Sequence, residues 1–190
     1  MHLTDEDYED AAEILDCEVA AIKAVAEVEV RGDGFLPDGR PKILFEAHVF
    51  SRLTHGRYDE SHSNISCPHW DKTLYGGAGA HQWDRLNLAR SLDKDAANKS
   101  CSWGMFQIMG ENYAACGLPS INMFVESMMS GGELGHLMMF CQFIKSNHKL
   151  QDALQERRWE DFARIYNGPR YAENNYHTKL AVAYAEHSHE

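Results

Sequence analysis

The chain has 190 residues, 44% of them hydrophobic, and a formal net charge of −11 from 18 basic and 29 acidic side chains. This length and composition suit one globular domain over residues 1–190. The acidic balance argues against a general nucleic-acid or anionic-membrane binder, because the affinity of such proteins comes largely from Lys and Arg.

The apolar runs, the cysteines and the histidines of the sequence indicate where the protein is located and whether it binds a metal. No apolar run reaches the roughly 18 residues that span a bilayer, and the start of the chain, residues 1–7, has neither the basic nor the apolar segment of a secretory signal. The five cysteines are odd in number and follow no CxxC pattern, so reduced thiols are expected. His55, His62 and His69 share a polar stretch but match no ligand motif. We therefore expect a soluble cytoplasmic chain without a metal or a cofactor.

Two amphipathic helices are predicted at the start of the chain. Thr4 is a candidate N-cap with Asp7 three residues later, and an apolar stripe follows it. Asp16 is the expected cap of a second helix that ends at about Val30. The stripe of the first helix consists of Tyr8, Ala11, Ala12 and Leu15.

Glu29 lies on the apolar face of the second predicted helix. At about 100° per residue it shares that face with Ile22 and Val25, whereas Glu27 points to the other side. A carboxylate buried against aliphatic side chains tends to have a raised pKa, and a Glu protonated near neutral pH can act as a general acid. A Glu in this position could equally be the partner of a buried Arg or of a backbone group.

The next segments are predicted from turn residues and periodicity. Residues 31–41 are turn-rich and would hold any short β-hairpin. Pro41 fits the first position of a third helix that runs to about Leu53 and carries Glu46 on its apolar face. Residues 54–80 are polar and irregular, as in the wall or lid of a binding cleft. A helix over residues 81–92 follows.

The remainder alternates helices with short breaks. Ser120 caps a helix that stops at Gly131 and Gly132, and another apolar stripe follows. Shorter helices are expected over residues 150–154 and 159–166, and Pro169 is the expected start of a last helix through about His187. Strand-like alternation is nearly absent. The predicted fold is mainly α, a single domain with a substrate cleft and possibly a short β-hairpin.

Three segments combine unusual residues with turns: residues 27–32, residues 102–108 and residues 165–169, the last followed by Tyr171. Gln107 can both donate and accept hydrogen bonds, and Gly104 lets the backbone approach a ligand closely. Aromatic and amide side chains in loops suit sugars, because pyranose rings pack on flat apolar faces and hydroxyls pair with neutral polar groups.

The order Glu, then Gly-x-x-Gln, then Tyr-Asn resembles the lysozyme-like superfamily of goose-type lysozymes and soluble lytic transglycosylases. More closely, the chain resembles the N-acetylmuramidase domain of bacteriophage and prophage endolysins over essentially its whole length, so a separate cell-wall-binding module is not expected. One departure is that Val30 stands where the superfamily often has Ser. The matching blocks are residues 24–29, 38–46, 102–110 and 166–169.

The resemblance implies a site around Glu29 as the catalytic acid. Gln107 and Tyr166 are expected to line the cleft, and Asn167 to hold the site or the substrate. Ser102, Trp103 and Tyr171 are further candidate substrate contacts. Without the resemblance, Gln107 could cap a turn, and Trp103 and Tyr166 could be core aromatics. Glu46 is the candidate second carboxylate, although a helix-interior position favours a structural role for it.

By the same resemblance the expected activity is that of a glycoside hydrolase, an endolysin that cleaves the bond between N-acetylmuramic acid and N-acetylglucosamine. Two alternatives stay open: a lytic transglycosylase that forms 1,6-anhydromuramic acid, and an inactive sugar-binding phage protein. Peptidoglycan glycan strands are the expected partner of a monomer that neither inserts into membranes nor binds nucleic acid. The enzyme is expected to accumulate in the host cytoplasm and to reach the periplasmic wall after release.

Overall fold

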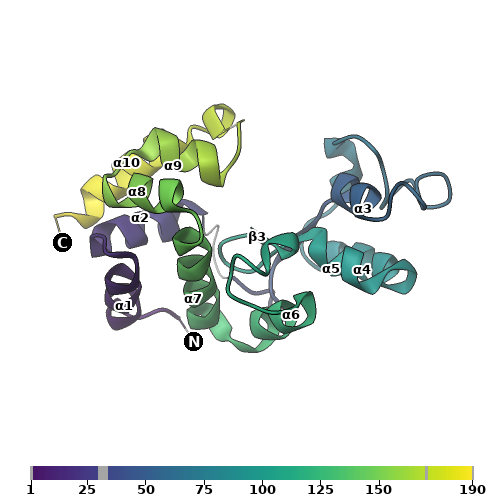
Figure 1. Ribbon diagram of the computed structural model, residues 1–190, viewed down its shortest axis with the longest axis horizontal. Helices are drawn as coiled ribbons and strands as arrows, with labels where there is room; N and C mark the ends of the chain where they lie inside the picture. The colour runs from purple at the N-terminus through teal and green to yellow at the C-terminus, as the bar shows by residue number, and fades with distance from the viewer. Residues whose placement is uncertain (1, 30–33, 170, 190) are drawn as a thin grey trace.

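A computed structural model describes residues 2–29, 34–169 and 171–189 of the chain. Within these residues helices predominate, as predicted, and the strands form one small sheet (Figure 1). The α-helices are α1 Asp5–Leu15, α2 Val19–Glu29, α3 Ala47–Leu53, α4 Ala80–Leu92, α5 Lys94–Lys99, α6 Ile121–Ser130, α7 Gly132–Lys145, α8 His148–Gln155, α9 Trp159–Tyr166 and α10 Tyr176–His187. The strands are β1 Ile43–Phe45, β2 Cys101–Trp103 and β3 Ile108–Met109, and the 3-10 helices are η1 Lys72–Tyr75, η2 Gly110–Asn112 and η3 Tyr171–Asn174.

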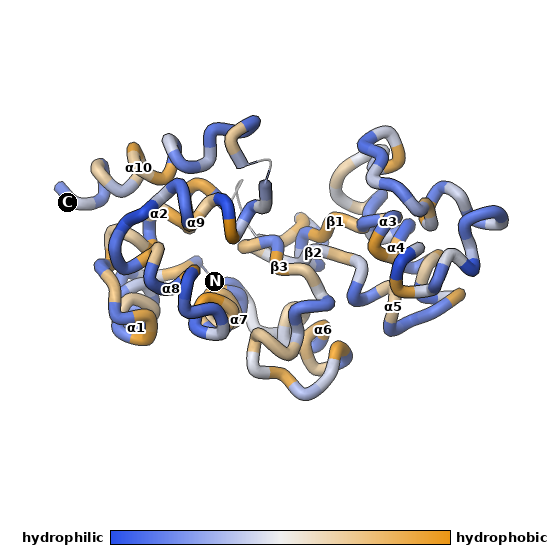
Figure 2. Tube along the Cα trace, turned by 45° about the horizontal axis from the view of Figure 1, so that its top comes forward, coloured by the Kyte–Doolittle hydropathy of each residue, from blue (hydrophilic) through white to orange (hydrophobic). Residues whose placement is uncertain are grey.

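The helices form two groups on either side of the sheet. Figures 1 and 2 show α1, α2 and α7 to α10 on one side, which we call the Glu29 lobe, and α3 to α5 on the other, which we call the α3–α5 lobe. The antiparallel strands lie side by side between the lobes in the order β1-β2-β3. The sheet therefore connects the two lobes.

The first helix begins as predicted, but Asp16 plays a different part. Thr4 accepts from the Asp7 amide and the Asp7 carboxylate accepts from the Thr4 amide, which completes a capping box. Asp16 is the C-cap of α1 in the left-handed conformation, with φ of 52°. The predicted N-cap at Asp16 is therefore wrong, because Asp tolerates the left-handed region that ends a helix.

The α2 helix places Glu29 at its last position. Ala21, Ile22 and Val25 are buried in the core, Glu27 is exposed, and Glu29 is half-buried. The face predicted from the sequence is therefore the face that packs inward, and α10 packs against this helix. Val30, the predicted helix end, lies outside the described residues.

The predicted third helix starts too early. Pro41 pairs with Phe35 in an isolated antiparallel bridge, and β1 follows it before α3 begins at Ala47. A proline φ near −65° suits extended backbone as well as a first helical turn, and pairing with β2 decides between them here. In the register Ile43 faces Trp103 and Phe45 faces Cys101. Glu46 consequently sits at a strand-to-helix junction, not inside a helix.

Most of the other helices follow the predicted pattern, but α5 was not predicted and the last helix starts later than expected. Ser120 caps α6 by accepting from the Met123 amide, and α4 and α9 match their predicted ranges closely. Pro169 does not start the last helix: η3 comes first, and α10 begins at Tyr176. Within the described residues, no helix is long and apolar enough to cross a membrane. The five cysteines are free thiols, as predicted.

Candidate functional site

Glu29 meets Asn167 where two helices end. Asn167 is the C-cap of α9, and its Nδ2 donates to Glu29 Oε1 at 2.9 Å. The Oδ1 atom of the same amide is buried and has no hydrogen-bond partner. A buried oxygen without a partner carries a free-energy cost. The structure thus brings together Glu29 and Asn167, two of the predicted site residues.

Tyr166 connects α9 to the turn between β2 and β3. Its hydroxyl donates to the Phe106 carbonyl at 2.7 Å, and its ring stacks on Phe162 with centroids 5.5 Å apart. Burial raises the pKa of Tyr166 well above its ordinary value, and the charge of Glu29 raises it further. The hydroxyl therefore stays protonated, and its hydrogen bond joins the end of α9, where Asn167 contacts Glu29, to the turn.

Gln107 stands exposed on that turn and is oriented from both ends of its amide. Its Nε2 donates to the Gly104 carbonyl at 2.8 Å, and its Oε1 accepts from Ser102 Oγ at 2.9 Å. Its φ of 49° lies in the left-handed region, which is uncommon for a residue with a side chain. Ser102 is buried, so its part is to orient Gln107. The turn presents one pre-oriented amide to solvent.

Below the turn lies His136, a fully buried residue of α7 that the sequence patterns do not single out. Its Nδ1 accepts from the Met105 amide at 3.2 Å, so its Nε2 carries the proton that is donated to the Met128 carbonyl at 2.9 Å. Gly104 has φ of 68°, and a Cβ there would lie 2.7 Å from the His136 ring. A neutral imidazole thus supports the turn that carries Gln107.

The free energy of unfolding should depend on pH through the protonation of His136. Burial lowers the pKa of His136 below the ordinary value of 6.5, although the Met128 carbonyl and Glu133 act in the opposite direction. The unfolded chain then binds the proton first, so unfolding becomes easier as the pH falls below about 6.5. We expect His136→Gln to reduce this slope by at most about 1.4 kcal/mol per pH unit in urea unfolding. His148→Gln, at an exposed His, is the control, and an unchanged slope in His136→Gln would refute the assignment.

Trp103 is not a sugar contact. Its side chain is fully buried, its Nε1 donates to the Asn98 carbonyl at 3.0 Å, and its ring lies edge-on to Trp83 and Phe124. The signal that suggested a binding role was its place beside a glycine turn. The strand pairing of β2 turns the ring into the core instead.

Tyr171 lies at the start of η3, and its hydrogen bond is made to a residue other than Glu29 or Asn167. Its hydroxyl donates to Glu160 at 2.8 Å, and the Arg164 guanidinium lies 5.9 Å from its ring centroid. These contacts are with α9, so Tyr171 braces the segment that follows Asn167. Its ring is partly exposed, which leaves the predicted role as a substrate contact open.

Glu46 belongs to the other lobe. The hydroxyl of Tyr75 donates to its carboxylate, with oxygen distances of 2.8 and 2.9 Å, and His48 Nδ1 lies 3.3 Å away. Burial raises the pKa of Glu46, while the Tyr75 hydrogen bond, His48 and Arg85 act in the opposite direction. Burial and the nearby Glu46 raise the pKa of Tyr75 to about 12. The strand register puts Glu46 at the end of β1 remote from the Gln107 turn.

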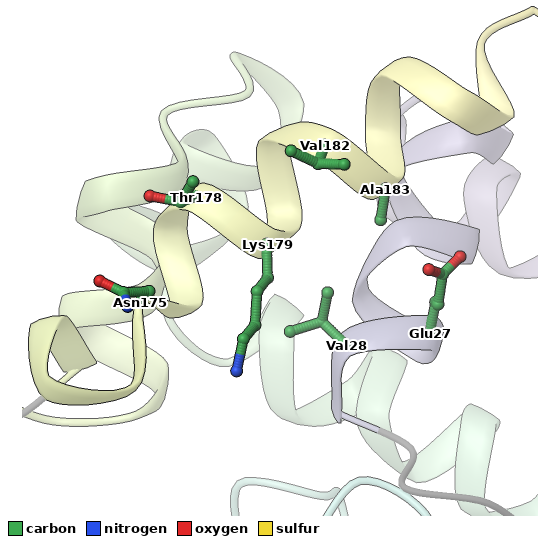
Figure 3. Close-up of a pocket in the computed structure, with 7 residues that line it drawn as sticks. All are labelled: Glu27, Val28, Asn175, Thr178, Lys179, Val182 and Ala183. Carbon is green, nitrogen blue, oxygen red and sulfur yellow. The ribbon is translucent and has the colours of Figure 1, made fainter.

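An open groove of about 640 Å³ lies between α2 and α10 (Figure 3). Val28 and Lys179 face each other across it, and Glu27 at its edge pairs with His187 at 2.8 Å. The groove adjoins the helix end that carries Glu29. Among the described residues, no set of three or more His, Cys, Asp or Glu side chains is arranged to hold a metal ion.

Comparison with known proteins shows which family and which solved structures the chain is similar to. The model of a family described as N-acetylmuramidase matches residues 18–188. No curated protein matches the chain. Among solved structures, the crystal structure of the Burkholderia AP3 phage endolysin superposes with a TM-score of 0.92 at 37% sequence identity, covering 100% of this chain and 73% of that one.

Proposed function

Because the chain belongs to the N-acetylmuramidase family, we propose that it is a lysozyme-like endolysin that hydrolyses peptidoglycan between N-acetylmuramic acid and N-acetylglucosamine. The observation that carries the proposal is the contact of Glu29 with Asn167, which Tyr166 ties to the Gln107 turn. A carboxyl group, two amides and a protonated phenol are thereby gathered from three parts of the chain. Such a set suits a neutral sugar polymer.

Glu29 is the proposed proton donor. It is half-buried at the end of α2, on the face that carries Ile22 and Val25. Surroundings of this kind favour the protonated carboxyl, which can give its proton to the leaving glycosidic oxygen as an oxocarbenium-like centre develops. Gln107 is positioned to hold a hydroxyl or an acetamide of the bound sugar, because its amide is exposed and already oriented.

Asn167 serves both protonation states of Glu29. When the carboxylate is ionised, Nδ2 donates to it, as in the structure. When the carboxyl group is protonated, an amide turned by about 180° would present Oδ1 as an acceptor for that proton. The buried Oδ1, which has no partner in the structure, is the atom that would then gain one. The bond to the ionised carboxylate needs no turn of the amide, so on balance Asn167 favours the ionised form.

Removal of the Asn167 amide should shift the pH profile of activity. A donor favours the ionised form of the carboxylate it contacts, so Asn167→Ala should retain the proton on Glu29 to higher pH. We expect the alkaline limb of kcat/KM to move to higher pH and the maximal rate to fall by about tenfold, because the carboxyl group loses its orientation. Asn174→Ala, at an exposed Asn of η3, is the control. An alkaline limb at the wild-type position would contradict this role.

The second half of the reaction depends on what attacks the sugar. An inverting hydrolase needs a second carboxylate at about 6.5–9.5 Å, and a retaining one needs a nucleophile at about 5–5.5 Å. Glu46 remains the candidate for such a carboxylate, although it follows the end of β1 that is remote from Gln107. Because Glu46 lies at that remote end, a second candidate function is lytic transglycosylase chemistry, in which the muramic acid C6 hydroxyl is the nucleophile.

Mass spectrometry of digested, purified peptidoglycan decides between these reactions. Hydrolysis adds one water across the bond and leaves a reducing muramic acid, which is the result we expect. Fragments lighter by one water, with 1,6-anhydro ends, would instead establish the transglycosylase. If intact glycan strands bind without any new ends, the chain is an inactive sugar-binding protein, and both enzymatic proposals fail.

The biological setting follows from the same proposal. A phage enzyme of this kind would accumulate in the host cytoplasm, act on the periplasmic wall after the inner membrane is breached, and bring about host cell lysis. It would work as a monomer on glycan strands, without a cofactor, without inserting into membranes and without binding nucleic acid. Analytical ultracentrifugation of the purified protein would test the monomer.

A further inference from the structure

Trp70 is a large aromatic side chain displayed on the irregular segment between α3 and α4. It is 46% exposed, whereas Trp83 and Trp103 are buried in the core. Its indole Nε1 donates to the Tyr75 hydroxyl at 2.9 Å, and the two rings meet edge-on with centroids 6.4 Å apart. An exposed indole that is held at its polar end keeps its apolar face in a fixed direction.

Tyr75, which accepts the hydrogen bond from Trp70, is itself held by further hydrogen bonds. The Tyr75 hydroxyl in turn donates to the Glu46 carboxylate, which is 15% exposed, so indole, phenol and carboxylate form one chain of hydrogen bonds. Gln82, which is buried, donates to the Tyr75 and Gly77 carbonyls and accepts from the Phe45 amide. These bonds fasten the segment to β1. The arrangement is therefore built into the fold and is not a loop that happens to carry an aromatic residue.

This cluster and Gln107 lie at opposite ends of the same strand. Gln107 Nε2 lies 3.5 Å from the Lys42 carbonyl, just before β1, and Glu46 follows β1 directly. At about 3.3 Å per residue, Lys42 and Glu46, which flank β1 and are four residues apart, are separated by roughly 13 Å. A polymer that lies along β1 from the Gln107 turn would reach the α3–α5 lobe at Glu46, whereas a monosaccharide would not.

We infer that Trp70, Tyr75 and Glu46 form a second glycan-binding subsite. It takes an N-acetylhexosamine unit that lies several sugar units along the glycan chain from the bond that is cleaved. The inference rests on the proposed function and extends it. The apolar face of a pyranose ring packs on the exposed indole, and the Glu46 carboxylate accepts from a ring hydroxyl. The cluster holds the polymer while Glu29 acts elsewhere on it, so Glu46 serves binding here.

The test is binding of a soluble tetrasaccharide of alternating N-acetylglucosamine and N-acetylmuramic acid to full-length protein carrying Glu29→Gln, which prevents turnover. Calorimetry gives the Kd, and tryptophan fluorescence reports the exposed indole. We expect Trp70→Ala in this background to raise the Kd by about tenfold and to abolish most of the fluorescence change. Leu88→Ala, at an exposed apolar residue of the same lobe, should leave the Kd within about twofold.

An unchanged Kd in Trp70→Ala would overturn the subsite. If that variant is misfolded by circular dichroism, Trp70→Phe decides, because it keeps an aromatic face and loses only the bond to Tyr75: a smaller rise in Kd supports the subsite, and no rise overturns it. Digestion of peptidoglycan by the wild-type protein is measured in parallel. Digestion without any dependence of binding on Trp70 overturns the subsite alone, whereas Trp70-dependent binding without digestion overturns the proposed hydrolase alone.

Discussion

Replacing Glu29 by Gln is expected to lower peptidoglycan hydrolysis by about 10²- to 10⁴-fold, the range that a positioned general acid contributes. Gln fills nearly the same volume and still meets Asn167, but it has no acidic proton to give to the leaving oxygen. The rate of lysis of outer-membrane-permeabilised Gram-negative cells measures the effect. Because a half-buried carboxylate is removed, the melting temperature should be equal to that of the wild type or slightly higher.

The matched control for this variant is Glu27→Gln. Glu27 lies on the same helix two residues earlier, but it is exposed and pairs with His187. Its replacement removes the same charge and should leave the lytic rate nearly unchanged. Equal lytic rates for Glu29→Gln and the wild type would end the case for Glu29 as the acid. Equal losses in the two variants would mean that net charge, not proton transfer, is being measured.

Replacing Trp103 by Ala is expected to lower the free energy of unfolding by about 3–5 kcal/mol, as for other large aromatic residues removed from a core. The ring is fully buried between Trp83 and Phe124, and its loss would also leave the Asn98 carbonyl without its donor. Typical domains are stable by only about 5–15 kcal/mol, so the variant should be close to unfolding at 37 °C. Urea unfolding measures the difference.

The control for Trp103→Ala is Trp70→Ala, which removes the same side chain from an exposed position. Its cost should stay below about 1 kcal/mol. The pair of variants separates a core role from a ligand role: Trp103→Ala should lose stability, and Trp70→Ala should lose affinity for glycan. A fully stable Trp103→Ala with reduced sugar binding would restore the interpretation of Trp103 as a substrate contact.

Local sequence patterns were sufficient to predict those helix ends and faces that depend only on residues close together in the chain. Thr4 and Asp7 form the predicted capping box, and Ser120 caps α6 as predicted. The apolar face of α2 also follows from periodicity alone, so the different exposures of Glu27 and Glu29 could be predicted. In each case the interacting residues lie within about one helical turn of one another.

Local signals failed where distant strands decide the conformation. Pro41 suits both a helix start and an extended segment, and a strand as short as β1 shows no alternation that could separate the two. Pairing of Phe45 with Cys101 settles the matter across 56 residues, since 101 − 45 = 56. The error carried over to Glu46, which was expected inside a helix and stands instead at a strand-to-helix junction.

The candidate site shows the same limit. Asn167 and Glu29 are 138 residues apart, so no spacing rule brings them together, and only the resemblance to a family placed them in one site. Trp103 was assigned to that site because it adjoins the Gly104 turn, although strand pairing directs it inward. His136 was missed because a His among apolar residues carries no sign of the turn that it supports.

The most direct test of the central claim is the formation of new reducing ends in purified peptidoglycan, measured after borohydride reduction for the wild-type protein and Glu29→Gln side by side. The account predicts reduced muramic acid at the new ends with the wild type, and a yield about 10²- to 10⁴-fold lower with the variant. Reduced glucosamine at the new ends, or the same yield of muramic acid from both proteins, would contradict it.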